Sequence, residues 1–214
     1  TKGHEYSASC YSWEMRMRPS VWPDELETVL LAKSADRGQG GRPESLATHT
    51  WEVLCRLRDF INLRESLPEH LEMPGIWHIL YWATFLHDFG KSVPAFQGIL
   101  RGDASSKEVW GAHRHELFSL AFLDWIEAGL TADERLWVAA AIVSHHRDAS
   151  WLRSSYSSIL TGGGDSLLAP LHALPEDHVA GLHRWLRAAG WSWAQTLGLD
   201  AHSVRPVEVV AAPV

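Results

Sequence analysis

The chain has 214 residues, 46% of them apolar and 21% charged, a composition typical of a globular protein with a substantial core. Its formal net charge of −7 argues against a protein that grips nucleic acid over its whole surface. No apolar run approaches the ~20 residues of a membrane-spanning helix, and the N-terminal residues lack the apolar segment of a signal peptide. Cys10 and Cys55 form no CxxC pair, so we expect reduced thiols and a cytoplasmic protein.

The first forty residues predict an irregular lead-in, one helix and a loop. Residues 1–20 show no hydrophobic period. Pro23, Asp24 and Glu25 are typical of a helix start, and apolar residues from Leu26 predict that this helix continues to Lys33. A glycine-rich loop follows at 38–41, but no GxxxxGK[ST] pattern is present, which excludes a P-loop.

The next two predicted helices each end or begin near a histidine. Apolar residues at three- and four-residue steps predict one helix from about Pro43 to Ile61, with His49 on the edge of its apolar stripe. A second predicted helix runs from near Ile76 and places His87 at the end of its core-facing side. Pro94 starts a short helix, and we expect a loop over residues 102–106.

Three further helices are predicted in the remaining chain. His115 shares a face with Phe118, Phe122 and Ile126, which predicts a helix that ends at Gly129. A capping box over residues 131–134 opens a nearly all-apolar helix that we expect to be central and buried. Residues 177–189 favour a helix, and 204–210 a short strand or a tail. At least five long helices and little strand indicate an all-α fold.

Candidate metal ligands stand at the ends of these predicted helices. His87 and Asp88 are adjacent, and adjacent helical residues point about 100° apart, so both reach one ion only near a helix end. Gly90 supplies such an end. Deprotonated histidine and aspartate are good metal ligands. Further inward or terminal histidines are His49, His113, His115, His145 and His146.

The order H … HD … H … HH resembles the HD superfamily of metal-dependent phosphohydrolases. A more specific set consists of Lys33-Ser34 before the glycine-rich loop, Glu44-Ser45-Leu46-Ala47-Thr48-His49-Thr50, Leu86-His87-Asp88-Phe89-Gly90-Lys91, Phe96-Gln97, Arg114-His115-Glu116 and His145-His146. This set resembles the HD nuclease domain of the type I CRISPR-associated nuclease–helicase from about residue 31 to 147. The resemblance implies an HD-domain helical bundle around one or two metal ions, and a nuclease that cuts single-stranded DNA fed to it by a helicase.

The resemblance also implies roles for individual residues. His49, His87 and Asp88 would form one metal site, and Asp88 would bridge to a second site held by His115, His145 and His146. Asp88 and Lys91 are the expected catalytic residues, and the expected DNA contacts are Lys91, Arg114 and Arg147. His113 is less favoured than His115, because Arg-His-Glu fits the family pattern around His115. Glu116 and Ser144 are the expected hydrogen-bond acceptors behind the ligands.

A histidine-rich site favours transition metals over Mg, and we expect Mn, Ni, Co or Fe rather than Mg or Zn. The expected partners are single-stranded DNA, a CRISPR helicase subunit or domain, and the crRNA-guided surveillance complex, with no membrane. We expect a single domain over residues 1–214, with the motif-bearing core at 31–147 and a C-terminal helical part and tail at 148–214.

The sequence departs from the family pattern in two places. The family usually has a further aspartate, in a Ser-Ala-Asp-type stretch after the His-His pair, and Asp148, Asp165, Asp177 and Asp200 all lie outside that context. The first site is then incomplete, or its last ligand lies beyond Val214. No Walker A motif is present, so we expect a stand-alone nuclease subunit or an excised domain. Two alternatives stay open: a nucleotide phosphohydrolase of the same superfamily, or a non-enzymatic docking module.

Overall fold

The computed structural model describes residues 18–35, 41–111, 113–146, 150–151, 154 and 168–211. Most of the expected lead-in, and also Arg147, Asp148 and Asp165, lie outside these ranges. The helices are α2 (Asp24–Glu27), α3 (Leu46–Leu63), α4 (Leu67–His70), α5 (Ile76–Leu86), α6 (Pro94–Leu100), α7 (Ala104–Trp110), α8 (His115–Ser119), α9 (Ala132–Ser144), α11 (Leu168–His172) and α12 (Glu176–Thr196), with 3-10 helices η2 (Phe89–Ser92), η3 (Leu120–Trp125) and η6 (Leu199–His202). Two small antiparallel sheets pair β1 (Leu31–Lys33) with β2 (Glu44–Ser45) and β3 (Ile126–Ala128) with β4 (Glu208–Val209).

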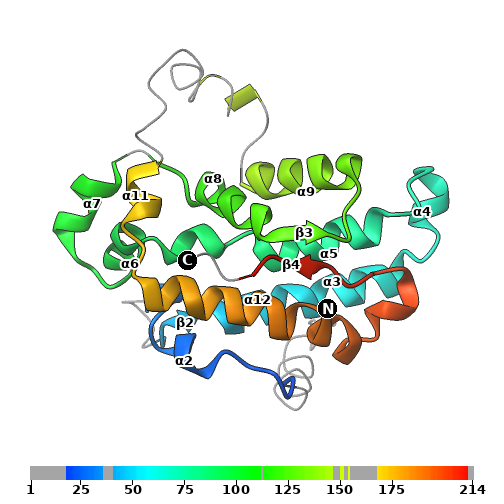
Figure 1. The fold of residues 1–214 in the computed structure, drawn as a ribbon, viewed down its shortest axis with the longest axis horizontal. Helices are drawn as coiled ribbons and strands as arrows, with labels where there is room; N and C mark the ends of the chain where they lie inside the picture. The colour runs from blue at the N-terminus through cyan, green and yellow to red at the C-terminus, as the bar shows by residue number, and fades with distance from the viewer. Residues whose placement is uncertain are drawn as a thin grey trace, which may run out of the picture.

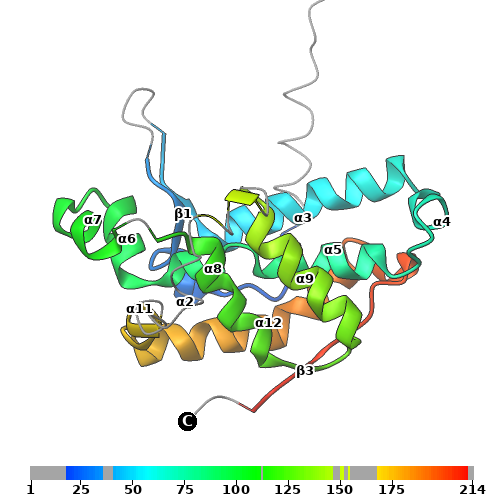
Figure 2. The same ribbon diagram turned by 90° about the horizontal axis from the view of Figure 1, so that it is seen from above.

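Helix α5 is the centre of the bundle. It packs between α3 and α9, with α12 across another side (Figures 1 and 2). Its residues are apolar nearly all round, as expected of a helix enclosed by others, and Tyr81, Phe85 and Leu86 are completely buried. Trp185 and Trp193 of α12 each bring a ring centroid to 5.5 Å from that of Phe85. The predicted all-α class is confirmed.

The sequence places the start of helix α3 near Pro43, but Glu44 and Ser45 form β2 and the helix begins at Leu46. Ser45 caps it, because its hydroxyl oxygen accepts a hydrogen bond from the Thr48 backbone amide at 3.0 Å. Val53 of the predicted apolar stripe is only half-buried, whereas the other five residues are buried: Leu46, Thr50, Leu54, Leu57 and Ile61. Ala47, Trp51 and Cys55 are buried as well, which widens the face that packs on the core. His49 lies on the edge of that stripe and is mostly covered, with 15% of its side chain exposed.

The predicted helix over residues 24–33 is wrong in its second half. The helix ends at Glu27, and residues 31–33 form strand β1 instead. Leu30, Leu31 and Ala32 are all buried, which a helix covered on one side does not allow for three consecutive residues. The Gln97 side chain accepts from the Leu31 amide at 2.9 Å and donates to the Leu31 carbonyl at 2.8 Å. The side chain of Gln97 therefore satisfies both backbone hydrogen-bonding groups of Leu31 in this strand.

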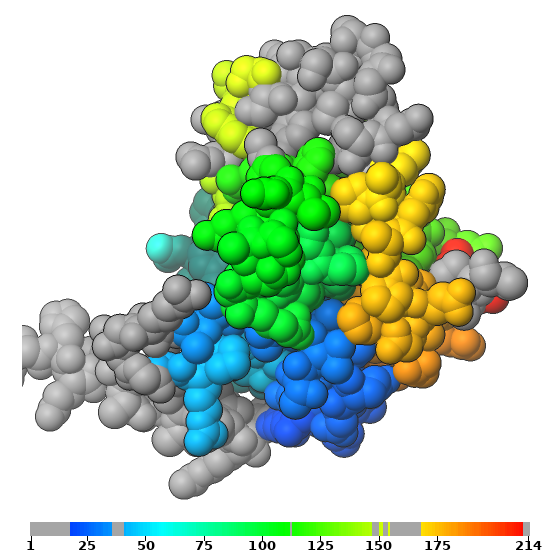
Figure 3. All heavy atoms as spheres, turned by 90° about the vertical axis from the view of Figure 1, so that its left-hand side faces the viewer, coloured from blue at the N-terminus to red at the C-terminus, as the bar shows by residue number. Residues whose placement is uncertain are grey.

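Three other boundaries differ from the sequence prediction. The expected helix from His115 to Gly129 is only α8, followed by η3 and by strand β3, which pairs with β4. Helix α7 occupies part of the expected loop at 102–106. Helix α12 extends to Thr196, beyond the expected end at 189. Figure 3 shows α6 and α7 at the surface beside α11.

Helix α9 is not the buried central helix that its composition predicts. Its capping box is present, with Thr131 and Glu134 bonded reciprocally. However, only Val138 and Ile142 are buried, while Leu136 and Trp137 are 69% and 55% exposed. The helix packs on α5 and α8 through one face, and among the described residues nothing covers the opposite face.

No helix in the described part of the chain combines the length and the apolar character that crossing a membrane requires.

His78 generates a prediction about stability and pH. It is fully buried on α5, its Nδ1 accepts from the Arg205 amide at 3.1 Å, and its Nε2 donates to the Gly129 carbonyl at 2.9 Å. Only a neutral imidazole makes both bonds. Burial lowers the pKa of His78 below 6.5, so the unfolded chain binds more protons below that pH. The stability that His78 contributes is therefore complete above about pH 6.5 and declines as the pH falls.

Urea unfolding of wild type and of His78→Gln between pH 7.5 and 5.5 tests this. The difference in free energy of unfolding between the two proteins should narrow as the pH falls. A difference that stays constant over this range would contradict the role assigned to His78.

Candidate metal centre

The site is built around the turn that ends α5. Asp88 follows the last helical residues and is 1% exposed. Gly90 lets α8 approach this turn, because a Cβ at Gly90 would lie 2.0 Å from the His115 carbonyl oxygen. The Ser119 hydroxyl accepts from the Gly90 amide at 2.9 Å and donates to the His87 carbonyl at 2.6 Å. Glycine and serine together fix α8 against the His-Asp turn.

The two carboxylate oxygens of Asp88 face different sets of side chains. Oδ2 lies 3.2 Å from Nε2 of His49, 3.2 Å from Nε2 of His87 and 2.8 Å from Nζ of Lys91. Oδ1 lies 3.0 Å from Nε2 of His115 and 3.7 Å from Nε2 of His145. The carboxylate thus contacts side chains from α3, α8 and the ends of α5 and α9.

The imidazoles of His87 and His145 are oriented by the helices that precede them. Nδ1 of His87 lies 2.7 Å from the Thr84 carbonyl, and Nδ1 of His145 lies 2.6 Å from the Ile142 carbonyl, in each case three residues earlier. A carbonyl only accepts, so Nδ1 carries a hydrogen, and in the neutral ring Nε2 keeps the lone pair that a metal ion would use. The same local geometry therefore aims both rings.

Carboxylates lie behind the other two rings. Glu44 Oε1 lies 2.9 Å from Nδ1 of His49, and the other oxygen of Glu44 pairs with Lys33 at 2.6 Å. Glu116 Oε2 lies 3.5 Å from Nδ1 of His115, close to the expected arrangement. The prediction that Ser144 is the other acceptor is wrong. Ser144 is exposed, and His145 bonds to a backbone carbonyl instead.

The potential ligand atoms fall into two groups, in each of which they lie within 4.8 Å of one another: His49, His87 and Asp88, and His115, His145 and His146. These are the groups that the sequence resemblance implies. Within the described residues, neither His113 nor a late aspartate joins them. Asp177 and Asp200 are exposed, and the buried face of α12 carries no carboxylate.

The electrostatics of these residues fit a metal ion. Asp88 Oδ1, His115 Nε2 and His145 Nε2 are buried, and the two nitrogens lie 3.0 and 3.7 Å from the oxygen without the alignment of a hydrogen bond, a costly arrangement that a cation would relieve. Burial lowers the pKa of His145 to about 4, and burial with the adjacent His115 also lowers the pKa of His146. Both rings are then neutral near pH 7, as metal binding requires.

Asp88 is ionised despite its burial. Burial by itself would raise its pKa, but the neighbouring imidazoles of His115, His49 and His87 outweigh that effect and hold the pKa well below its usual range. At His49 the neighbouring groups also outweigh burial, but here they raise the pKa. Burial would lower its pKa, yet Asp88 and Glu44 raise it. Protons therefore compete with a metal ion more strongly at His49 than at His145.

Two of the expected DNA contacts are engaged within the protein. Lys91 is buried, and its ammonium group contacts Asp88 and donates to the Ala32 carbonyl at 3.1 Å. Arg114 donates through Nε and Nη2 to Glu116 Oε1 at 2.7 and 2.6 Å. The contact of either residue with phosphate stays a prediction, as does that of Arg147, which lies outside the described residues.

Comparison with known proteins gives one match. A family model described as "Cas3, HD domain" matches residues 32–207, which extends beyond the motifs at 31–147 and includes α12. No similar curated protein and no similar solved structure was found.

The two groups should differ in how firmly they hold an ion. The second group offers three imidazoles and Asp88 Oδ1, whereas the first offers two imidazoles and Asp88 Oδ2. With fewer protein donors, the first group leaves more of the coordination to water and should release its ion more readily during dialysis. We therefore expect His145→Gln to reduce the Mn²⁺ retained after dialysis more than His49→Gln does, as measured by elemental analysis.

His172→Gln, at an exposed position on α11, is the matched control and should retain as much Mn²⁺ as the wild type. A greater loss from His49→Gln than from His145→Gln would reverse the assigned order of the two groups.

Proposed function

The chain belongs to the Cas3 HD-domain family of CRISPR-associated nucleases, and we propose that it hydrolyses phosphodiester bonds of single-stranded DNA in a metal-dependent reaction during CRISPR interference. The observation that carries the proposal is the buried Asp88 carboxylate with imidazole nitrogens against both of its oxygens. A carboxylate in that position can be shared between two ions, which is the arrangement that phosphodiester hydrolysis uses.

Each group of ligands has a proposed share in this reaction. His49 and His87 with Asp88 Oδ2 would hold one ion, and His115, His145 and His146 with Asp88 Oδ1 the other. When bound, such ions lower the pKa of an attacking water and neutralise charge on the phosphoryl oxygens. Imidazole ligands favour Mn, Ni, Co or Fe over Mg, which prefers oxygen ligands.

The residues around Asp88 keep the carboxylate in place. Lys91 balances its charge through the 2.8 Å contact and ties it to β1 through the Ala32 carbonyl. The carbonyls of Thr84 and Ile142 hold two imidazoles in the orientation that directs Nε2 inward. The chain's own contribution to catalysis is this preorganisation.

DNA delivery is assigned to partners. The net charge of −7 disfavours strong binding of the isolated chain to DNA. We propose that a CRISPR helicase subunit or domain feeds the strand to the site, and that the crRNA-guided surveillance complex recruits both.

Replacing Asp88 tests the nuclease proposal. Asp88→Ala should abolish Mn²⁺-dependent cleavage of circular single-stranded DNA and lower the bound metal, because both ions lose the shared ligand. Circular dichroism should show the helical content of the wild type. The matched control is Asp177→Ala, which removes an exposed aspartate from α12 and should cleave normally.

Retained cleavage by Asp88→Ala in the presence of Mn²⁺ would contradict the assignment. Release of phosphate or nucleoside from free nucleotides, with circular DNA left intact, would instead favour the nucleotide phosphohydrolase. Wild-type protein that binds no metal would favour the docking module.

Binding by the isolated chain gives a separate prediction. Fluorescence anisotropy with labelled single-stranded DNA should give a Kd of about 10⁻⁵ M or weaker at physiological salt, little dependence on sequence and a shallow salt slope, because the protein as a whole is acidic. A nanomolar Kd, or a clear sequence preference, would show that the chain does not need a partner to hold its substrate.

A further inference from the structure

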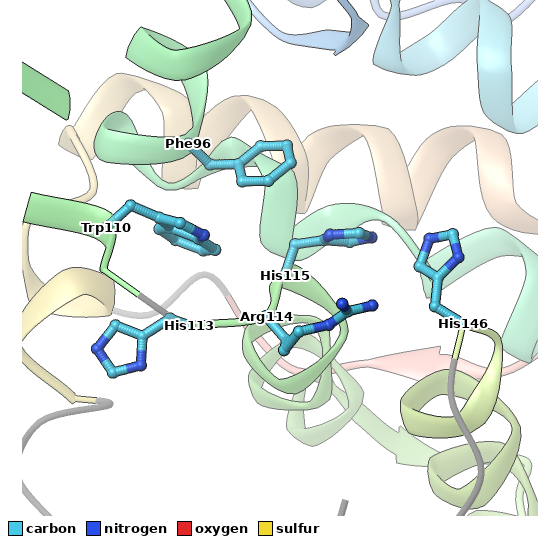
Figure 4. Close-up of a pocket in the computed structure, with 6 residues that line it drawn as sticks. All are labelled: Phe96, Trp110, His113, Arg114, His115 and His146. Atoms are coloured by element: carbon cyan, nitrogen blue, oxygen red, sulfur yellow. The ribbon is translucent and has the colours of Figure 1, made fainter. Parts of the chain in front are cut away.

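A cavity of about 400 Å³ adjoins the second group of ligands, within the size range of small-molecule sites. It is lined by Phe96, Trp110, His113, Arg114, His115 and His146. Figure 4 shows the rings of Phe96 and Trp110 at one end and His146 at the other, with His115 and Arg114 between them. The cavity therefore connects an aromatic surface to two candidate metal ligands.

The aromatic end of the cavity is held in place by packing. The ring centroids of Phe96 and Trp110 lie 5.1 Å apart, and that of Phe96 lies 5.2 Å from that of His115. Trp110 is 6% exposed and packs on the buried Phe118, at 5.0 Å between ring centroids. Trp110, Phe118 and Val93 form a small core of their own. A flat ligand would meet rings that are already positioned.

The lining also suits an anionic ligand. It contains an arginine and three histidines but no carboxylate. Two nitrogens of Arg114 bond to Glu116, and its guanidinium lies over the ring of Trp151, with Cζ 5.3 Å from the ring centroid. By contrast, the larger cavity beside His49, of about 960 Å³, is lined by Glu27, Glu44 and Glu52 as well as by basic residues. The smaller cavity is the better match for a nucleotide.

We propose that this cavity binds one nucleobase of the DNA strand, at the nucleotide next to the scissile phosphate, by stacking against Phe96. This inference rests on the proposed nuclease function. Every base has a π-face, so stacking holds a strand without reading its sequence. The base would fix the position of the strand while its phosphate lies toward His115 and His146. The chain would then hold the reacting nucleotide locally although its overall charge is negative.

Oligonucleotides with one abasic residue test the proposal on the wild-type protein loaded with Mn²⁺. The abasic residue is moved along the strand, and kcat/KM is measured for cleavage at a defined bond. We expect one position near that bond where loss of the base lowers kcat/KM by about tenfold, and other positions with little effect.

Phe96→Leu should lower kcat/KM on the intact strand by a similar factor, and Phe96→Tyr, which keeps the ring, should restore it. On the strand that is abasic at the sensitive position, Phe96→Leu should cost no further activity, because ring and base act through one contact. Bound metal should equal that of the wild type. Phe60→Leu, which removes a partly exposed ring on α3, is the matched control and should cleave normally.

Cleavage that is insensitive to abasic residues at every position would overturn the inference and leave the nuclease function standing. Loss of metal from Phe96→Leu, or additive effects of the variant and the abasic residue, would also overturn it, since Phe96 would then act through His115. A metal-loaded wild type that cleaves no strand would reject the nuclease function itself, and the base-binding role with it.

Discussion

The packing of the helices around the site centres on the buried carboxylate of Asp88. Asp88 is 1% exposed, and burying an unpaired carboxylate is very costly, so the surrounding chain has to compensate for it. The compensation comes from Lys91 and from imidazoles on three different helices or helix ends. Any folding of α3, α5, α8 and α9 that did not bring these groups together would leave that charge unpaired. The same packing of helices that forms the bundle therefore also assembles the site.

The orientation of the site is a consequence of helix geometry. His87 and His145 follow α5 and α9, and each directs Nδ1 at the carbonyl three residues earlier. Helix ends have unsatisfied carbonyls, so they supply this acceptor without any special side chain. Behind the turn, Phe89 stacks on Trp185 of α12 at 4.8 Å between ring centroids. Rigid packing on one side and backbone acceptors on the other hold the Nε2 atoms toward Asp88.

Local patterns in the sequence were sufficient for the features that depend on local physics. The capping box at Thr131 is present as predicted. Gly90 does not end α5, which stops at Leu86, and it lies inside η2, where it allows the close approach of α8. The resemblance also implied the same two groups of histidines that lie close together in the structure, and their role as metal ligands stays a prediction. The elements that were predicted wrongly depend on distant contacts: β1 pairs with β2, and Gln97, 66 residues away, bonds to Leu31.

The burial of α9 was also predicted wrongly, for a related reason. The composition of α9 indicates burial on all sides, but burial is decided by how many neighbours a helix has, and α9 packs through one face only. Glu44 was missed as the acceptor for His49 because it lies before the helix, where no helical spacing relates it to the ring.

The central claim is that Asp88 gives one oxygen to each of two metal ions. Anomalous diffraction at the manganese edge, from crystals of the wild-type protein grown with Mn²⁺, tests it most directly. The account predicts two peaks about 3.5–4 Å apart, one nearest Oδ2 with His49 and His87, the other nearest Oδ1 with His115, His145 and His146. A single ion bound by both oxygens of Asp88, with either group of histidines turned away, would contradict it.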